Sequence, residues 1–289
     1  MAKKIKISVL TTIGNEKFPP NERQDKWVEA VSCYCDLADE VVVVNGGKRN
    51  SRETGILQTI DKVKQVMLPW PYEWNWVHAP KALNAGLEQC TGDWVIRLDI
   101  DQFIHEKDFK AVRQKLEDCP RDVDALTFQK MSMTYGGKYY QKGPVPIAFR
   151  NKSYIAIGEQ IGKRTDLCFP IRFVKHKKVD GYELPCGTGL AQSKTGISYW
   201  NYDRFFKTKE VVKKELWRFS KAYHRYFKSW IFGETEEEAF QGFLNMMRGR
   251  HDRSPYDYTS NMHDHPKYIV EAVRGLKKEM FGHSAWGML

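Results

Sequence analysis

The chain of 289 residues lacks several features that would assign it to a common class. No apolar run is long enough to cross a bilayer, and the start, Met1-Ala-Lys-Lys-Ile-Lys6, lacks the apolar stretch of a signal peptide. These absences predict a cytoplasmic protein. The six cysteines lack the spacing of a zinc site, so we expect free thiols.

An excess of acidic residues is lacking as well, because 46 Lys and Arg outnumber 36 Asp and Glu and give a net charge of +10. Such a charge suits anionic small molecules, phosphates of lipid-linked or nucleic-acid ligands, or an anionic membrane at the inner face. The densest basic cluster, Lys175-His-Lys-Lys178, is equally typical of a solvated turn. Charge alone therefore chooses no function.

Hydrophobic patterns in the first half alternate between strand and helix. Strands are expected at Ile5–Thr12, Glu40–Asn45, Lys62–Leu68 and Trp94–Leu98, and helices at Glu22–Cys35, with Asn21 as N-cap, and at His78–Cys90. This order predicts an α/β fold whose Rossmann-like, mainly parallel central sheet is flanked by helices. Beyond residue 205 the pattern is helical, at 207–230, from 235 onward and at 266–281.

The most informative motif is Asp99-Ile-Asp101, directly after the apolar run Trp94–Leu98. The carboxyl ends of strands in an open α/β sheet form the ligand crevice, where two carboxylates suit a hard divalent cation that also binds phosphates. A second pair, Asp122-Val-Asp124, follows no such strand and is expected to be a solvated strand start. Only the first pair predicts a metal and diphosphate site.

Four ordered motifs carry a resemblance. They are the strand that leads to Asn15-Glu16, Ala38-Asp-Glu-Val-Val-Val-Val44 with its Gly-Gly turn, Lys81-Ala-Leu-Asn-Ala-Gly86, and Gly92-Asp-Trp-Val-Ile-Arg-Leu-Asp-Ile-Asp101. Together they resemble a glycosyltransferase of the GT-A fold, most similar to family 2. The resemblance covers Ile5 to about His105, and more loosely Ile171 to Lys213. It implies a GT-A catalytic domain at 1–205, with a nucleotide-sugar half to about 105 and an acceptor half from 106, and a helical extension at 206–289 packed on it.

The resemblance also implies roles for single residues. Asp101 matches the ligand of Mn²⁺ or Mg²⁺ between the donor phosphates, and Asp99 matches the carboxylate that reaches the ribose and helps hold the metal. Residues matched to the nucleotide site are Lys81, Asn84, Thr11, Asn15 and Glu16. The implied reaction is an inverting transfer from a nucleoside-diphosphate sugar to a hydroxyl of a carbohydrate, lipid-linked or other acceptor, with a nucleic acid as a less favoured acceptor.

Two positions depart from the family pattern. Asn45 stands where the family usually has an Asp that reads the nucleobase, and an amide both donates and accepts hydrogen bonds. Tyr199 stands where many members have a metal-ligating His. We therefore expect altered or relaxed base recognition, and either weaker metal binding or a water in the place of the His ligand.

The catalytic base is the least determined residue. Inverting transfer needs a carboxylate beside the acceptor hydroxyl, and the downstream acids are Glu159, Asp166, Asp180, Glu183 and Asp203. Glu183, in a loop bounded by Gly and Pro, is the first prediction and Asp180 the second, although a solvated loop acid is an equally good interpretation.

Two further functions stay open. A sugar-nucleotide nucleotidyltransferase would share the sheet, but Thr11-Thr-Ile-Gly-Asn-Glu-Lys17 is a poor version of its Gly-rich phosphate loop. A binding protein on a decayed transferase fold would explain Asn45 and Tyr199. His263-Asp-His265 has no evident third metal ligand and is interpreted as structural.

Overall fold

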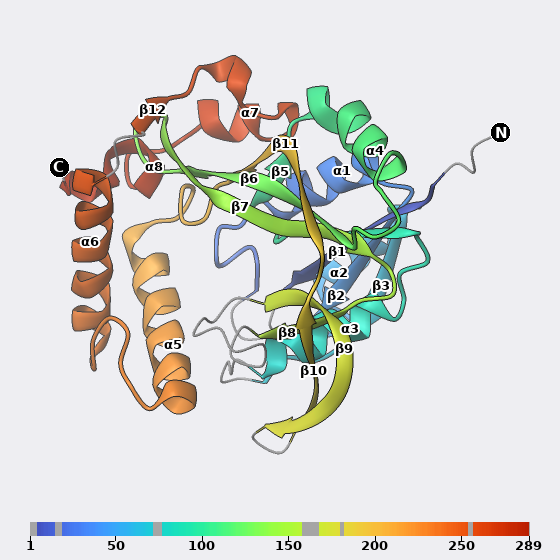
Figure 1. Ribbon diagram of the computed structural model, residues 1–289. Helices are drawn as coiled ribbons and strands as arrows, with labels where there is room; N and C mark the ends of the chain where they lie inside the picture. The colour runs from blue at the N-terminus through green and yellow to red at the C-terminus, as the bar shows by residue number, and fades with distance from the viewer. Residues whose placement is uncertain are drawn as a thin grey trace.

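The computed structural model describes residues 5–14, 19–71, 77–157, 168–179, 182–253 and 257–288. Its centre is a nine-stranded sheet in the order β3-β2-β1-β4-β7-β6-β11-β5, with β12 beside β7 (Figure 1). The strands of this sheet are β1 (Ile7–Ile13), β2 (Glu40–Asn45), β3 (Val63–Met67), β4 (Trp94–Arg97), β5 (Gln102–Ile104), β6 (Ala125–Met133), β7 (Lys138–Arg150), β11 (Gln192–Asn201) and β12 (Asp257–Thr259). The helices are α1 (Trp27–Leu37), α2 (Arg52–Gln58), α3 (His78–Leu87), α4 (Phe109–Glu117), α5 (Lys209–Phe227), α6 (Glu236–Arg253), α7 (Lys267–Arg274) and α8 (Phe281–Ser284).

The first four strands of the sheet, β3-β2-β1-β4, pair in parallel. The apolar residues of β1, β2 and β4 are buried on both faces of the sheet, and Val41 to Val44 of β2 are fully inaccessible. Val41 and Val43 pack with Trp27 and Val31 of α1, whereas Val42 and Val44 pack with helix α3. The predicted α/β fold with a mainly parallel central sheet flanked by helices is confirmed.

Antiparallel and long-range pairings complete the sheet. β7 pairs antiparallel with both β4 and β6, and β11 pairs parallel with β6 and antiparallel with β5. Because β5 follows the Asp99-Ile-Asp101 motif directly, its pairing with β11 brings the segment after Asn201 to that motif.

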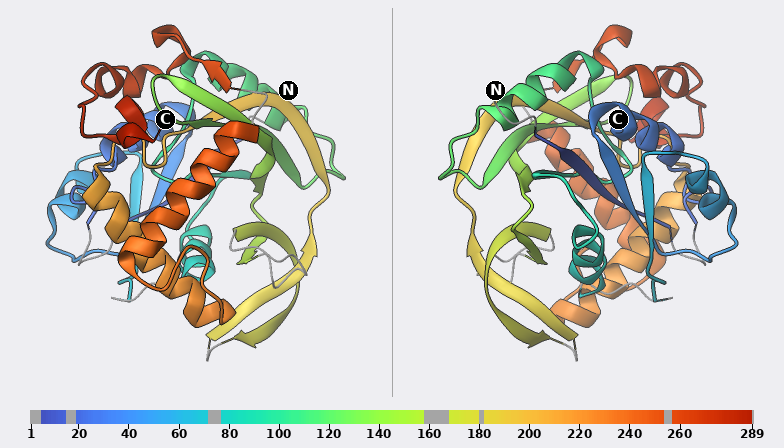
Figure 2. Two further views of the ribbon diagram at one scale, coloured as in Figure 1. Left: turned by 90° about the vertical axis from the view of Figure 1, so that its left-hand side faces the viewer. Right: turned by 90° about the vertical axis from the view of Figure 1, so that its right-hand side faces the viewer.

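A smaller antiparallel sheet, β10-β9-β8, projects from the body as a long hairpin (Figures 1 and 2). Its strands are β8 (Tyr154–Ile157), β9 (Cys168–Val179) and β10 (Tyr182–Gly189). Asp124 anchors it, since its carboxylate lies 2.6 Å from the Arg172 guanidinium and 3.0 Å from Lys152 Nζ. The expectation of a solvated Asp124 is wrong, because this residue is buried.

Helices α5 and α6 lie side by side next to the sheet (Figure 2). Val212 and Leu216 of α5 pack against Phe240, Phe243 and Leu244 of α6. Within the described residues, no helix has the length and apolar character needed to cross a membrane. The helices predicted at 207–230 and from 235 onward are present as α5 and α6. The helix predicted at 266–281 is only partly confirmed, because α7 ends at Arg274.

Helix α1 begins at Trp27, five residues later than predicted, and its N-cap is Lys26 rather than Asn21. The Asn21 side chain instead accepts a hydrogen bond from Trp27 Nε1 at 3.2 Å and donates one to Glu53 at 3.0 Å. Glu53 belongs to α2, a helix that the sequence pattern did not predict because its seven residues include Gly55.

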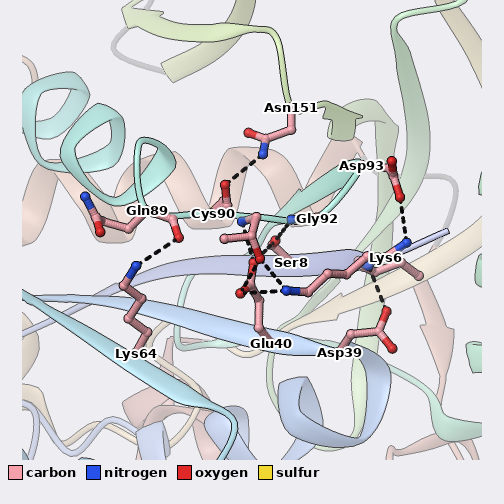
Figure 3. A network of polar contacts seen from close by, with 12 residues as sticks. Lys6, Ser8, Asp39, Glu40, Lys64, Gln89, Cys90, Gly92, Asp93 and Asn151 are labelled. Atoms are coloured by element: carbon pink, nitrogen blue, oxygen red, sulfur yellow. Dashed lines mark hydrogen bonds and ion pairs between the residues drawn. The ribbon is translucent and has the colours of Figure 1, made fainter.

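The amino ends of the parallel strands are tied together by a polar network around Glu40 (Figure 3). One Glu40 oxygen accepts hydrogen bonds from the Ser8 hydroxyl and the Thr91 N–H, both at 2.5 Å, and the other accepts from Thr91 Oγ1 at 2.8 Å. Lys6 Nζ lies 3.3 Å from the same carboxylate. Burial would raise the pKa of Glu40, but these hydrogen bonds and Lys6 lower it below its ordinary value. Both oxygens of the Glu40 carboxylate are therefore engaged in contacts within the fold.

Candidate active site

Asp99 and Asp101 lie in the tight turn between β4 and β5, at the carboxyl edge of the parallel strands. The buried Tyr34 hydroxyl holds this turn, since it lies 2.6 Å from the Asp99 carbonyl oxygen and 2.9 Å from that of Gln102. Helix α1, which carries Tyr34, thus fixes the backbone of the motif. The position matches the ligand crevice expected of an open α/β sheet.

The two carboxylates differ in their surroundings. Asp99 is 46% exposed, pairs with the Arg97 guanidinium at 3.2 Å and accepts a hydrogen bond from Gln102 Nε2 at 3.0 Å. Asp101 Oδ1 is buried and has no hydrogen-bond partner among the described residues. Burial, with repulsion from Asp203 and Asp99, raises the pKa of Asp101 to about 7. A buried carboxylate oxygen without a partner is a typical place for a cation.

A cavity of about 360 Å³ opens at this edge. The first half of the chain and the segment from Asp203 onward both line it. The lining residues are Thr12, Arg23, Asp25, Trp70, Asp99, Ile100, Asp101, Asp203, Arg204, Lys207, Glu215, Arg218 and Phe219. Helix α5 therefore forms one wall of the site.

Asp203 lies at the cavity because the backbone that follows β11 is hydrogen-bonded to the Asp99-Ile-Asp101 turn. The Tyr202 N–H donates to the Asp101 carbonyl oxygen at 2.8 Å. The Asp203 carboxylate pairs with the neighbouring Arg204 guanidinium. Burial would raise the pKa of Asp203, but Arg204 and Lys207 lower it, so this carboxylate stays ionised near Asp101.

A compact ion network lines the same cavity as Asp203. Lys207 Nζ lies 2.9 Å from Asp25 and 2.7 Å from Glu215, and Arg23 lies 2.5 Å from Asp25. The Lys207 and Asp25 side chains are 9% and 3% exposed. Because removing one partner of a buried pair leaves an uncompensated charge, this network fixes α5 and the 19–25 turn relative to each other.

A second, smaller cavity of about 160 Å³ lies beyond the ends of β1 and β2. It is lined by Gly14, Pro19, Pro20, Asn45, Gly47, Lys48, Ser51 and Glu53. Thr12 lines the large cavity and Gly14 the small one, so the end of β1 contributes to both cavities. Trp70 packs closely over Gly46, where a Cβ atom would lie 2.3 Å from its ring.

The residues that the sequence assigned to the nucleotide site do not all lie at the two cavities. Thr11 is buried, and its neighbour Thr12 faces the large cavity instead. Asn45 lines the small cavity, whereas the exposed Lys81 lines neither of the two. Asn15 and Glu16 lie outside the described residues.

Asn84 has a structural role in the fold. Its Nδ2 donates to the carbonyl oxygens of Pro80 and Ile155, both at 2.7 Å, and its Oδ1 accepts from the Ile155 N–H at 2.9 Å. Both amide hydrogens are used, so the side chain fastens α3 to β8. This structural role is an alternative explanation for the asparagine in the Lys81-Ala-Leu-Asn84 motif.

The predicted base is not brought to the large cavity. Glu183 is exposed on β10 and pairs in register with Lys178 of the projecting hairpin, while Asp180 lies outside the described residues. Tyr199 is 1% exposed within β11 and packs in the core, so it does not occupy a metal-ligand position in the cavity. Sequence reasoning included Asp203 among five acids but did not favour it, and it missed Lys207, Glu215 and Arg218.

The donor set at the motif fits a hard divalent cation. Asp99 and Asp101 supply carboxylate oxygens, and Asp101 Oδ1 is the orphaned acceptor described above. Among the described residues, no group of three or more His, Cys, Asp or Glu is arranged to hold a metal. Two protein carboxylates are nevertheless typical for Mg²⁺, which completes its shell with waters and substrate phosphates.

Comparison with known proteins identifies the class. The model of glycosyl transferase family 2 matches residues 22–183, more than half of the chain. The chain therefore belongs to glycosyltransferase family 2, as the four motifs indicated. Membership leaves the nucleotidyltransferase interpretation without support. No curated protein matches the chain.

Solved structures give more distant likenesses. A mannosyltransferase, PcManGT from Pyrobaculum calidifontis in complex with GDP-Man and Mn²⁺, is 19% identical over 44% of this chain and 36% of its own, with a TM-score of 0.33. S. aureus TarS 1-349 is 13% identical over 86% of this chain and 73% of its own, with a TM-score of 0.38. Glucosyl-3-phosphoglycerate synthase from Mycobacterium tuberculosis, in complex with Mn²⁺ and UDP-glucose, is 16% identical over 44% of each chain, with a TM-score of 0.31. This chain thus spans only about a third of the mannosyltransferase.

Proposed function

We propose that this chain is a metal-dependent, inverting glycosyltransferase that transfers a sugar from a nucleoside-diphosphate sugar to an acceptor hydroxyl. The observation that carries the proposal is the buried Asp101 Oδ1, which has no hydrogen-bond partner in the described part of the chain and lies beside Asp99 in the large cavity of a family 2 chain. A charge-bearing site of this kind at the carboxyl edge of a parallel sheet suits a cation and a diphosphate.

Asp99 and Asp101 would hold Mn²⁺ or Mg²⁺, and the bound cation would stabilise the negative charge that grows on the leaving diphosphate. The protein adds its own charges to this task. Arg204 and Arg218 line the same cavity, and guanidinium groups bind phosphate oxygens with matched geometry. The rigid ion network of Lys207 and Asp25 keeps this wall in place before substrate binds.

We further propose Asp203 as the general base, in place of Glu183 or Asp180. Asp203 lines the cavity with the metal pair, and its lowered pKa keeps it ionised. Asp203 would accept the proton of the acceptor hydroxyl as that oxygen bonds to the anomeric carbon and the bond to the diphosphate breaks. The proton thus ends on Asp203 and the electron pair of the broken bond on the diphosphate.

The acceptor would enter between α5 and the sheet, where Phe219 and Arg218 offer an aromatic face and a positive charge. This environment suits a carbohydrate or lipid-linked acceptor that carries phosphate. The basic hairpin with Lys175 to Lys178 would provide contact with an anionic membrane surface. A nucleic-acid acceptor is the less favoured form of the same chemistry.

The test is thermal unfolding of the wild type and of Asp101→Ala with UDP, GDP, TDP and CMP, each with Mn²⁺ and with EDTA. A ligand at 100 times its Kd should add about 2.7 kcal/mol to the wild type, with Mn²⁺ only. Asp101→Ala should keep its fold and lose this gain and turnover, whereas Asp61→Ala, at an exposed turn, should behave as wild type. Full activity in Asp101→Ala would sink the proposal. No metal-dependent gain with any nucleotide would favour a binding protein on a decayed fold.

A further inference from the structure

One face of strands β7, β6, β11 and β5 carries a row of polar side chains that leads to the Asp99-Ile-Asp101 turn. Residues paired in register on neighbouring strands point to the same face of a sheet, as do residues two apart on one strand. The row runs across the sheet in the order Tyr140, Ser132, Asn201 and Gln102. Its last three members are buried, and Gln102 donates a hydrogen bond to Asp99. The polar groups of the active site therefore continue across the sheet as far as β7.

The next row on the same face places two lysines directly opposite each other. Lys130 of β6 pairs in register with Lys142 of β7 on one side and with Tyr199 of β11 on the other. The Lys130 Nζ lies 6.0 Å from the centre of the Tyr199 ring. Like charges directly opposite each other on neighbouring strands destabilise a sheet. In the part of the chain that the structure describes, neither lysine forms a salt bridge with a carboxylate, so this repulsion is not relieved.

A third cation reaches this face from helix α6. The helix ends four residues before Asp257, whose backbone pairs with Tyr140 of β7. The carboxyl end of α6 therefore lies close to Tyr140, and its Arg250 acts electrostatically on both Tyr140 and Lys142. Burial, together with repulsion from Lys130 and Arg250, lowers the pKa of Lys142 below its ordinary value, although Tyr140 opposes this effect. The fold thus gathers positive charge on β6, β7 and α6.

The two lysines also act on the carboxylates of the active site. Burial would raise the pKa of Asp203, but Lys130 and Lys142 are among the cations that lower it. Lys130 also acts electrostatically on Asp101. Asp203 follows the last residue of β11 by two positions, so the lysines and Asp203 lie at one end of the same strands. The cations therefore flank the active site from the side of the sheet, whereas Arg218 flanks it from α5.

These side chains suit a phosphate group. A phosphate monoester carries nearly two negative charges and three oxygens that accept hydrogen bonds. Lysine ammonium groups bind phosphate as point charges, and the hydroxyls of Tyr140 and Ser132 are additional donors. Ser132 Oγ is buried beside Tyr140, yet no group among the described residues has the distance and angle of a hydrogen bond to it. A bound phosphate would relieve the repulsion between Lys130 and Lys142 and could accept from Ser132.

We propose that the face formed by Lys130, Lys142, Arg250, Tyr140 and Ser132 binds a phosphate group of the acceptor. The inference rests on the proposed function and adds the class of acceptor, which is a compound that carries a phosphate beside the hydroxyl to be glycosylated. A phosphate held on the sheet would direct that hydroxyl toward Asp203. The lysines would thereby set the affinity for the acceptor, and Asp203 would still take the proton.

Calorimetric titration of the full chain with glycerol 3-phosphate tests the inference, in EDTA and at an ionic strength held constant with chloride. Wild type should bind glycerol 3-phosphate and should not bind glycerol. Lys142→Gln should weaken this binding on the order of tenfold to a hundredfold, because a charge-assisted contact is lost. Its unfolding midpoint should stay or rise, because the repulsion from Lys130 is removed. A purely structural role of Lys142 would lower that midpoint instead.

Lys194→Gln, at an exposed position of β11, is the matched control and should keep the wild-type affinity. Equal affinity of wild type and Lys142→Gln overturns the inference, and so does a wild type that binds no glycerol 3-phosphate. A larger loss in Arg218→Gln than in Lys142→Gln overturns it as well, because the phosphate would then lie at α5.

Vesicles that contain phosphatidic acid separate a lipid-linked phosphate from a soluble one. Binding to either probe that is lost in Lys142→Gln supports the site and names the source. The titration contains no metal and no nucleotide, so its outcome is distinguishable from that of the proposed function. Loss of all metal-dependent nucleotide binding would remove the transferase but leave the phosphate site, whereas nucleotide binding without phosphate binding would remove only the acceptor class.

Discussion

The carboxylates at the two ends of the parallel strands differ in how far their hydrogen-bonding capacity is satisfied. At the amino ends, both oxygens of Glu40 accept hydrogen bonds from Ser8, Thr91 and Lys6, and the pKa of Glu40 is lowered. At the carboxyl ends, Asp101 has a buried oxygen without a partner among the described residues, and its pKa is raised to about 7.

This difference indicates that the carboxylate at the amino edge of the sheet has a structural role and that the carboxylates at the carboxyl edge have a functional one. A satisfied carboxylate stabilises the native state, while a crowded and partly unsatisfied one costs free energy until a ligand supplies what is lacking. The first edge should therefore respond to mutation in stability and the second in binding and rate. The following changes test that division, from the largest expected effect to the smallest.

Asp203→Asn should lower kcat by about 10²- to 10⁴-fold, since an amide cannot take the acceptor proton. Its unfolding midpoint should fall only modestly, because the change removes the attraction of Asp203 to Arg204 and Lys207 together with its repulsion from Asp101. Glu183→Gln, on the exposed hairpin, should keep kcat near that of wild type. Steady-state kinetics with a GDP-sugar and with a UDP-sugar measure both variants; the reverse ranking would return the base to Glu183.

Glu40→Ala should lower the free energy of unfolding by about 2–3 kcal/mol, because the buried Ser8 hydroxyl and the Thr91 N–H lose their acceptor. Nucleotide affinity of the folded variant should be unchanged. Urea titration and calorimetry give the two numbers, with Glu117→Ala as control. A loss of affinity without a loss of stability would refute the division of the two edges.

Acidification should weaken the fold through His78, at the start of α3 against Trp70. Burial and repulsion from Lys81 lower the pKa of His78 to about 4, so its contribution is complete above pH 6.5 and is lost as the pH falls from 6.5 toward 4. After allowance for solvent screening, we expect a loss of about 1 kcal/mol between pH 6.5 and 5. Denaturant titrations of wild type and His78→Gln should converge at low pH, and parallel curves would contradict this role.

Gly55→Ala should raise stability by about 0.5 kcal/mol. Gly55 lies inside α2 without a positive φ, and a Cβ there would meet no atom within 4 Å. The gain should appear in the unfolding midpoint and leave metal-dependent nucleotide binding unchanged. A lower midpoint would mean that α2 needs freedom at this position.

Local patterns predicted the parallel part of the sheet well. Val41 to Val44 and Trp94 to Ile96 are continuous apolar runs, and each lies in a strand close to the expected bounds. The motif ending in Asp101 was found because a strand end and a carboxylate pair coincide in the sequence. Such features depend on neighbours along the chain.

The rest depends on contacts distant in sequence. Asp203 reaches Asp101 through the pairing of β5 with β11, and no local pattern reports that register. The Asn21 side chain, expected as a helix cap, instead bonds to Glu53, 32 residues away. Glu183 seemed suitable as a loop acid, but its segment continues a β hairpin that projects from the body.

The bond from the Tyr202 N–H to the Asp101 carbonyl also sets an order of events during synthesis. The strands that flank Asp99 and Asp101 are made about a hundred residues before the segment that completes their cavity, and α5 follows later still. A nascent chain can therefore form the parallel core early, but it must wait for β11 before the site closes. Because such long-range pairing is slow, catalytic competence should appear as a late kinetic phase of folding, after most secondary structure has formed.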